Sequence, residues 1–178
     1  EAFAEKAVYF HGCYVNYNNH ELGKDVVTVL NAMNVGVIVT EEKCCGVPLI
    51  ANGYIEKARK NARFNIGSLA AAAVGNGARI VSASSSCSFA LKHEYRNLLE
   101  LDNSAIFDSL DYITRFIHER FQKGNIPNLR PVPVRAAYHS PCHLERMGGV
   151  INTIEMLKKI PGLDLTILHS ECCGIAGT

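Results

Sequence analysis

Short apolar runs alternate with longer segments of helical periodicity along the first part of the chain. Residues 7–10 are all apolar, which predicts a buried strand that ends just before Cys13. Between positions 20 and 33 the apolar side chains recur every three or four residues, which predicts a helix with one buried face. These side chains are Leu22, Val26, Val29, Leu30 and Met33. Residues 37–40 predict a second strand, which leads into Cys44.

The same alternation continues along the chain. We predict a long helix over residues 54–74, a third strand over 78–84, and helical segments over 89–99 and 110–122. Strands that alternate with helices favour parallel pairing with right-handed crossovers. The expected fold class is therefore α/β. In such sheets, binding sites lie at the carboxyl ends of the strands.

A proline-rich stretch then divides the chain. Residues 124–134 contain three prolines and favour neither a helix nor a central strand. A strand, a helix and another strand are predicted again between 135 and 169. The expected organisation is a first unit over residues 1–123, a linker over 124–134, and a second, incomplete unit over 135–178.

The strongest feature is a repeated cysteine pattern. The chain reads Cys-x30-Cys-Cys-Gly from Cys13 and Cys-x29-Cys-Cys-Gly from Cys142. The residues before each set agree as well, with Tyr9 matching Tyr138. Such self-similarity indicates an internal duplication. We therefore expect two homologous Rossmann-like parallel-sheet units, the second of which is truncated.

Composition and charge exclude several classes of function. The 18 basic and 17 acidic side chains nearly cancel, so no nucleic-acid partner is expected. No apolar run approaches the ~20 residues that span a bilayer, so this piece is expected to be soluble. The basic residues between 115 and 135 suit either a solvated face or contact with anionic lipid or a partner subunit. The first residues lack the basic start of a secretory signal and resemble the interior of a longer protein.

The cysteines point to metal or redox chemistry. An odd number without a signal peptide argues against a secreted disulfide framework and favours a reducing compartment. Each cysteine follows a predicted strand, so each set is expected to gather at one sheet edge; small buried hydrophobes are the alternative reading. Thiolates bind iron–sulfur clusters or zinc, and the spacing alone leaves the metal open. The seven are Cys13, Cys44, Cys45, Cys87, Cys142, Cys172 and Cys173.

Together these residues resemble the cysteine-rich CCG domain, whose full pattern is a single Cys, then Cys-Cys-Gly, then Cys-x2-Cys. The domain occurs in heterodisulfide reductase B subunits, in iron–sulfur subunits of lactate and glycolate oxidation systems, and in anaerobic glycerol-3-phosphate dehydrogenases. The resemblance runs essentially from Lys6 to Thr178. The stretches most similar to the C subunits of the last group are HGCYVNYNNHELGKDVVTVLNAMNVGV, EKCCGVPLIANG and ECCGIAGT.

The resemblance implies a [4Fe-4S] cluster as cofactor, which is of noncubane kind in the heterodisulfide reductases. In the first unit the matching ligand positions are Cys13, Cys44, Cys45 and Cys87. The first Cys of the family's Cys-x2-Cys is Ser84 here, so four thiolates remain. In the second unit Cys142, Cys172 and Cys173 match, and the last two ligand positions fall beyond Thr178. A cluster at the second site is therefore expected to be weak or absent.

The function that the resemblance implies is electron transfer without substrate chemistry. The chain would belong to an iron–sulfur subunit that passes electrons from flavin-bearing dehydrogenase subunits towards membrane quinone. The subunit would be peripheral, on the cytoplasmic face of the inner membrane. Family members carry two ferredoxin-type clusters before this region, so the chain is expected to be a fragment. The alternatives are a thiol–disulfide redox catalyst of the heterodisulfide type, a lactate or glycolate oxidase iron–sulfur subunit, and a zinc-stabilised docking scaffold.

Overall fold

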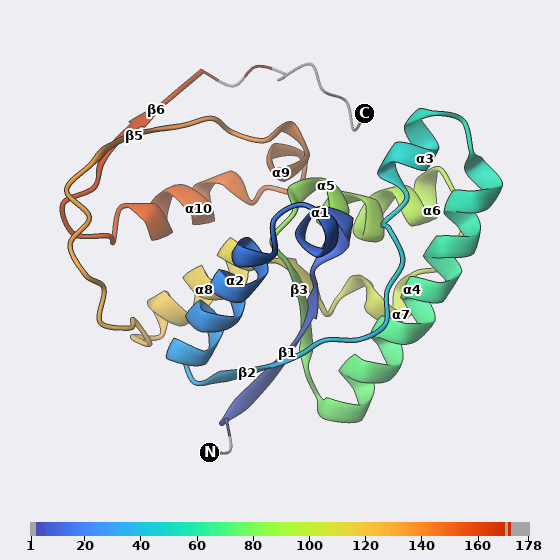
Figure 1. Cartoon of the computed structure of the whole chain (residues 1–178), viewed down its shortest axis with the longest axis horizontal. Helices are drawn as coiled ribbons and strands as arrows, with labels where there is room; N and C mark the ends of the chain where they lie inside the picture. The colour runs from blue at the N-terminus through green and yellow to red at the C-terminus, as the bar shows by residue number, and fades with distance from the viewer. Residues whose placement is uncertain (1–2, 170, 172–178) are drawn as a thin grey trace.

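The computed structural model describes residues 3–169 and 171, and its centre is a four-stranded parallel sheet (Figure 1). The strand order is β2-β1-β3-β4. The central strand β1 pairs with β2 on one side and with β3 on the other. Because parallel strands need crossover connections, helices separate them along the chain. The strands are β1 (Glu5–Phe10), β2 (Val35–Ile38), β3 (Arg79–Ser82) and β4 (Leu110–Tyr112).

Helices cover both faces of this sheet. Successive residues of a strand point to opposite faces, so Ala7 and Tyr9 belong to one hydrophobic cluster and Val8 and Phe10 to the other. The first cluster includes side chains of α2 (His20–Ala32) and α8 (Ile113–Gln122). The second includes side chains of α4 (Ile55–Asn76) and α7 (Ser104–Phe107). Burial on both faces explains the unbroken apolar run in the sequence of β1.

Three short helices stand at or shortly after the carboxyl ends of β1, β2 and β3. They are α1 (Gly12–Tyr17), α3 (Val47–Ala51) and α5 (Ser85–Phe89). α5 runs without a break into a π-helical turn, η1 (Ala90–Glu94), and then into α6 (Tyr95–Asn97). π-helical turns interrupt the regular hydrogen-bond pattern and occur frequently at functional sites.

The predicted helices over 20–33 and 54–74 are confirmed as α2 and α4. The helix predicted over 89–99 begins earlier, at Ser85, and includes the π-helical turn. The short helices α1, α3 and α7 were not predicted, because so few residues cannot show a helical period. Within the described residues, no helix combines the length and apolarity needed to cross a membrane.

The helix predicted over 110–122 is wrong at its start. Leu110–Tyr112 form strand β4, and α8 begins only at Ile113. Leu110 pairs with Ile80 in the buried sheet, and Asp111 forms an ion pair with Arg79 at the start of β3. Tertiary pairing therefore overrides the helical periodicity of these three residues.

The part of the chain after α8 forms a second, smaller parallel sheet. Residues 125–134 contain no helix or strand. β5 (Arg135–Tyr138) and β6 (Asp164–Ile167) then pair in parallel, and both are largely exposed. Between them lie α9 (Cys142–Arg146) and α10 (Val150–Leu157). α9 packs against α5 and α10 against α8, so helices join this part to the main sheet (Figure 1).

Two buried threonine hydroxyls lie in this junction. Thr114 of α8 and Thr153 of α10 have their Oγ1 atoms 2.7 Å apart, within hydrogen-bond distance. Both residues are buried. The Thr153 hydroxyl also donates to the Gly149 carbonyl at 3.2 Å, whereas Thr153 is the partner of the Thr114 hydroxyl. A buried hydroxyl without a partner is costly, so Thr114 depends on α10 staying in place.

We predict that Thr153→Val lowers the free energy of unfolding by about 1–3 kcal/mol, because it leaves the Thr114 hydroxyl without its partner. Adding Thr114→Val should restore part of that loss, since both hydroxyls are then gone. Thr28→Val is the control: Thr28 is exposed and bonds only to the Lys24 carbonyl of its own helix. Urea denaturation measures the effect. Equal losses in Thr153→Val and Thr28→Val would contradict the role of the pair.

Candidate metal centre

Four cysteines meet at one edge of the main sheet. Cys13 lies in α1 after β1, Cys44 and Cys45 follow β2, and Cys87 lies in α5 after β3. Because these strands are parallel, their carboxyl ends share one edge of the sheet. The side chains interact in sequence: Cys13 with Cys44, Cys44 with Cys45, and Cys45 with Cys87. The expected gathering of the first cysteine set is confirmed.

Helix α4 holds the loop that carries Cys44. Residues 39–45 have no helix or strand, so their backbone groups need other partners. Asn65 accepts a hydrogen bond from the Lys43 N–H at 2.7 Å and donates to the Lys43 carbonyl at 3.0 Å. Asn61 donates to the Cys44 carbonyl at 3.3 Å, and Ser68 donates to the Glu41 carbonyl at 2.7 Å. Their spacing of three and four residues places all three side chains on one face of α4.

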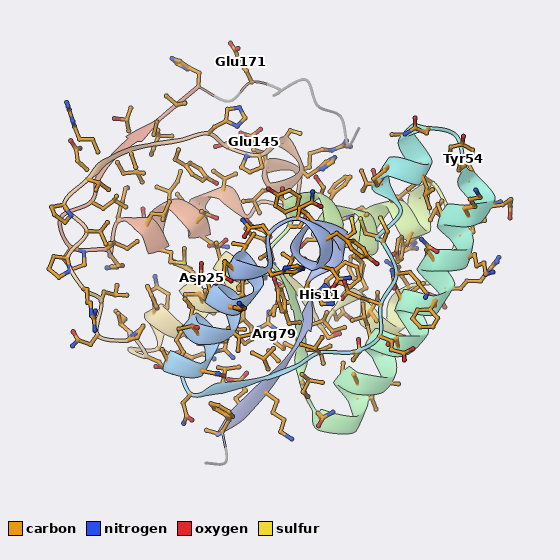
Figure 2. All side chains as sticks on the ribbon, in the orientation of Figure 1. His11, Asp25, Tyr54, Arg79, Glu145 and Glu171 are labelled. Atoms are coloured by element: carbon orange, nitrogen blue, oxygen red, sulfur yellow. The ribbon has the colours of Figure 1, made fainter. Side chains whose placement is uncertain are left out.

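Glu42 ties the same loop to Cys13. Its carboxylate accepts hydrogen bonds from the backbone N–H of Gly12 at 2.6 Å and of His11 at 3.2 Å. His11 lies where β1 meets α1 (Figure 2), and its Nδ1 is 3.2 Å from the carboxylate. Burial raises the pKa of Glu42 to about 7, although the two backbone donors oppose the shift. Glu42 therefore joins the loop after β2 to the chain that follows β1.

Two glycines permit the close approach of these segments. Gly12 has a φ of +76°, and a Cβ atom there would lie 3.3 Å from the Cys87 sulfur. Gly46, the glycine of the Cys-Cys-Gly sequence, has a φ of +98° and is the N-cap of α3. Both conformations favour glycine. A side chain at Gly12 would push α1 away from Cys87.

A cavity of about 450 Å³ opens beside the thiols. Cys13, Cys45 and Cys87 line it, together with Ser84. Ser84 caps α5 by accepting a hydrogen bond from the Cys87 N–H at 3.3 Å. The serine at the family's fourth ligand position thus faces the same space as the cysteines. An apolar part of the wall comes from Val15, Leu22, Val47 and Pro48.

The surroundings of the four thiols, including their mutual contacts, lower the pKa of two of them and raise the pKa of the other two. Hydrogen bonding from Cys45 lowers the pKa of Cys44 to about 5, with help from the Gly46 N–H and against the effect of burial. Hydrogen bonding from Cys45 also lowers the pKa of Cys87. Burial, with the charge of Cys44, raises the pKa of Cys13 to about 11. The hydrogen bonds to Cys44 and Cys87, with burial, raise the pKa of Cys45 well above its usual range. With a pKa of about 5 against about 11, the Cys44 thiol is therefore far more acidic than the Cys13 thiol.

This donor set suits a group larger than one ion. Within the part of the chain that the structure describes, no three Cys, His, Asp or Glu side chains converge as a single metal ion requires. Four thiols in a row beside a wide cavity instead match the ligand chemistry of an iron–sulfur cluster, which is held by cysteine thiolates. Zinc would need four ligands around one point.

The second cysteine set is only partly described. Cys142 is exposed at the start of α9, whereas Cys172 and Cys173 lie outside the described residues. Two histidines near the cysteines serve as hydrogen-bonding groups: the His143 Nδ1 is 3.0 Å from the Ser86 Oγ, and the His139 Nε2 is 2.8 Å from the Glu171 carbonyl.

Sequence reasoning missed Glu42 and Asn65. Glu42 stands two residues before Cys44 in EKCCG, and an acid there gives no sign of which backbone it will reach. Asn65 sits within a helix, where asparagine has low propensity. That unfavourable placement was the one available indication that its side chain has a tertiary partner.

We predict that Asn65→Leu destabilises the fold by about 3 kcal/mol, because it removes hydrogen bonds to both Lys43 backbone groups and to the Tyr95 hydroxyl. It should also increase the rate at which Cys44 is modified by thiol reagents. Asn76→Ala is the matched control, since Asn76 bonds only to the Ala72 carbonyl near the exposed end of the same helix. Unchanged stability in Asn65→Leu would show that α4 does not hold the loop.

A second prediction concerns thiol reactivity in the reduced, metal-free chain. At pH 7 iodoacetamide should modify Cys44 before Cys13 or Cys45, because the thiolate is the nucleophile and the pKa of Cys44 is about 5. Lowering the pH to 4 should slow this reaction about tenfold, since roughly a tenth of the thiolate then remains. Timed quenching with peptide mass spectrometry identifies the order. Earlier modification of Cys13 would contradict it.

Comparison with known proteins agrees with this geometry. The family model of the cysteine-rich domain CCG matches residues 7–92 and 136–178. No solved structure matches the fold significantly. The chain is 48% identical over 177 residues to the C subunit of the anaerobic glycerol-3-phosphate dehydrogenase of Escherichia coli, in a match that covers 99% of this chain and 45% of that protein. It therefore spans less than half the length of that relative.

Two further relatives come from other redox systems. The D subunit of the dihydromethanophenazine:CoB–CoM heterodisulfide reductase of Methanosarcina barkeri is 33% identical over 96% of this chain and 43% of its own length. The lactate utilization protein A of a Geobacillus strain is 28% identical over 97% of this chain and 74% of its own length. The family match covers most of the chain and includes all four gathered cysteines. The chain belongs to the cysteine-rich CCG domain family.

Proposed function

We propose that this chain is part of an iron–sulfur electron-transfer subunit and that Cys13, Cys44, Cys45 and Cys87 hold its cluster. The observation that supports this most is the meeting of four thiols, from three separate strand ends, beside one cavity. A [4Fe-4S] cluster, cubane or noncubane, is the group we propose. When bound, it would supply storage for single electrons.

The chain's own residues would tune and protect that group. The backbone N–H groups of Gly46 and Val47 donate hydrogen bonds to the sulfurs of Cys44 and Cys45. Hydrogen bonds to ligand sulfurs and restricted access of solvent both change the reduction potential of an iron–sulfur cluster. The apolar side chains of Val15 and Val47 in the cavity wall would limit the access of water.

The proposed redox partners follow from the relatives. The 48% identity to the C subunit of an anaerobic glycerol-3-phosphate dehydrogenase supports a place in a complex of that kind. Electrons would come from flavin-bearing dehydrogenase subunits and continue towards membrane quinone. We propose a peripheral location on the cytoplasmic face of the inner membrane for the assembled complex. The Geobacillus relative suggests an alternative, in which the same electron-transfer role belongs to lactate or glycolate oxidation.

We also infer that residues 135–178 repeat the first unit, 1–123, after the linker 124–134. Both parts run in the order strand, short helix, longer helix, strand. β1 pairs with β2 so that Val8 faces Ile38, and β5 pairs with β6 so that Tyr138 faces Ile167. Paired residues are separated by one residue fewer in β5–β6 than in β1–β2. The two cysteine spacings differ by the same one residue. The matching registers and the two family matches support the duplication.

For the second set we propose Cys142, Cys172 and Cys173 as ligands. Three thiolates are fewer than the four that an ordinary cluster uses. We therefore expect the first site to retain iron more firmly than the second. We assign these cysteines a role as ligands and propose no catalytic residue.

A second candidate function is thiol–disulfide redox catalysis. The lowered pKa of Cys44, which contacts Cys45 in the wall of the cavity of about 450 Å³, favours it. The Methanosarcina relative belongs to a heterodisulfide reductase. Turnover of a dithiol–disulfide pair by the purified chain would favour this candidate over electron transfer.

We predict that anaerobic reconstitution with iron and sulfide gives a coloured protein whose visible absorption bleaches on reduction. Cys45→Ser should lose most of the iron of the first site, and Ser84→Cys should raise cluster occupancy or change its spectrum. Cys142→Ser is the matched control, because Cys142 does not line the cavity. Iron and sulfide analysis measures the result. A colourless protein that retains zinc would favour a scaffold, and equal losses in Cys45→Ser and Cys142→Ser would defeat the ligand assignment.

A further inference from the structure

A second cavity, whose described lining contains no cysteine, lies between the two parts of the chain. Its volume is about 190 Å³, and its wall comes from η1, β4, the start of α8 and the segment around α9. We call it the basic cavity, after the basic side chains that line it: Lys92, His93, Arg115 and Arg146. This volume is below the ~300–1,000 Å³ of most drug-sized ligand sites. It suits a small ion or molecule and excludes a helix or strand.

The positive charge of the basic cavity is only partly neutralised. Among the described residues of its wall, Asp111 is the acidic one. Asp111 already forms an ion pair with Arg79, and its carboxylate lies 3.6 Å from the Arg115 guanidinium. Arg115 also lies 3.4 Å from Glu119. The carboxylates of Asp111 and Glu119 therefore pair with Arg79 and Arg115. They form no ion pair with Lys92 or Arg146.

Lys92 and Arg146 have no carboxylate within ion-pair distance among the described residues. The Lys92 ammonium donates to the Leu110 carbonyl at 2.8 Å and lies 5.0 Å from the centre of the Phe107 ring. The Arg146 guanidinium lies 5.1 Å from the centre of the Phe89 ring. Both cations are thus held in place by neutral groups, and more distant carboxylates such as Asp108 and Glu94 act on them without a direct ion pair.

The neighbouring positive charges also affect the pKa values of Lys92 and His93. Burial lowers the pKa of Lys92, and the charges of Arg115 and Arg79 add to the effect while Asp108 opposes it. Burial lowers the pKa of His93 as well, with further contributions from Lys92 and Arg146. Glu94 interacts electrostatically with Arg146 but does not line the cavity.

An aromatic stack fixes the two walls relative to each other. The rings of Phe89 and His143 are 4.8 Å apart and nearly parallel, and the Phe89 and His93 rings are 5.0 Å apart. Phe89 and His93 belong to α5 and the π-helical turn, whereas His143 belongs to α9. Because the two walls are already joined, Lys92 and Arg146 line one cavity without an ordering step, which lowers the entropic cost of binding a ligand.

We propose that the basic cavity binds a small phosphate-type dianion, with Lys92 and Arg146 as its principal donors. Charge-assisted hydrogen bonds from an ammonium and a guanidinium are the usual recognition of such oxyanions. A ligand there would contact η1 of the first part and α9 of the second. Binding would therefore stabilise the junction between the two parts of the chain.

Inorganic phosphate is the probe for this site, used with the metal-free chain at constant ionic strength. Isothermal titration calorimetry should show saturable binding of phosphate, and thermal unfolding should shift to higher temperature with phosphate but not with chloride. Lys92→Met and Arg146→Met should each weaken binding about tenfold or more. Lys57→Met is the matched control, because Lys57 lies 5.2 Å from the centre of the Tyr54 ring, a setting similar to that of Lys92 over Phe107.

The arms of this experiment separate the outcomes. Circular dichroism verifies that the variants are folded, and Arg146→Met provides a test that does not alter the buried turn η1. Competition by phosphatidic acid vesicles, but not by phosphatidylcholine vesicles, would identify a lipid headgroup as the source of the phosphate; no competition would identify a free phosphate compound. Absence of saturable binding, or equal affinity in the wild type, Lys92→Met and Arg146→Met, would overturn the proposal.

Discussion

The site depends on the hydrogen bonds between the Asn65 side chain and the backbone of Lys43. The loop that carries Cys44 and Cys45 has no ladder or helix partners, so its position is set by side chains of α4. Buried Asn65 supplies both a donor and an acceptor, which fixes the orientation of the peptide as well as its position. Without this contact the peptide next to the two central thiols would lose two of the hydrogen bonds that fix it to α4.

The other parts of the site build on that fixed loop. Glu42 connects it to the start of α1, and Gly12 lets α1 lie against the Cys87 sulfur. The parallel sheet supplies the common edge at which these segments meet. The basic cavity lies further along the chain that carries Cys87, where η1 faces α9. The helix that begins at the cysteine site therefore leads directly to the junction between the two parts.

The sequence predicted β1, β3, the helices α2 and α4, and the meeting of the first cysteine set, because burial and periodicity are local properties. It placed the second strand over 37–40, two residues later than β2 (Val35–Ile38). It did not predict β4, since three residues that also fit a helix become a strand only through pairing with β3. It did not predict the roles of Glu42, Asn65 or Lys92 either. Each acts through a partner at least eighteen residues away in sequence, and no local pattern records such a partner.

The central claim is that four thiols from three strand ends hold one iron–sulfur cluster. Iron X-ray absorption spectroscopy of the anaerobically reconstituted chain tests it most directly. The account predicts iron surrounded by sulfur, with a second shell of iron–iron scattering that Cys45→Ser weakens and Cys142→Ser leaves in place. Iron bound mainly by oxygen or nitrogen, with no iron–iron scattering, would contradict it.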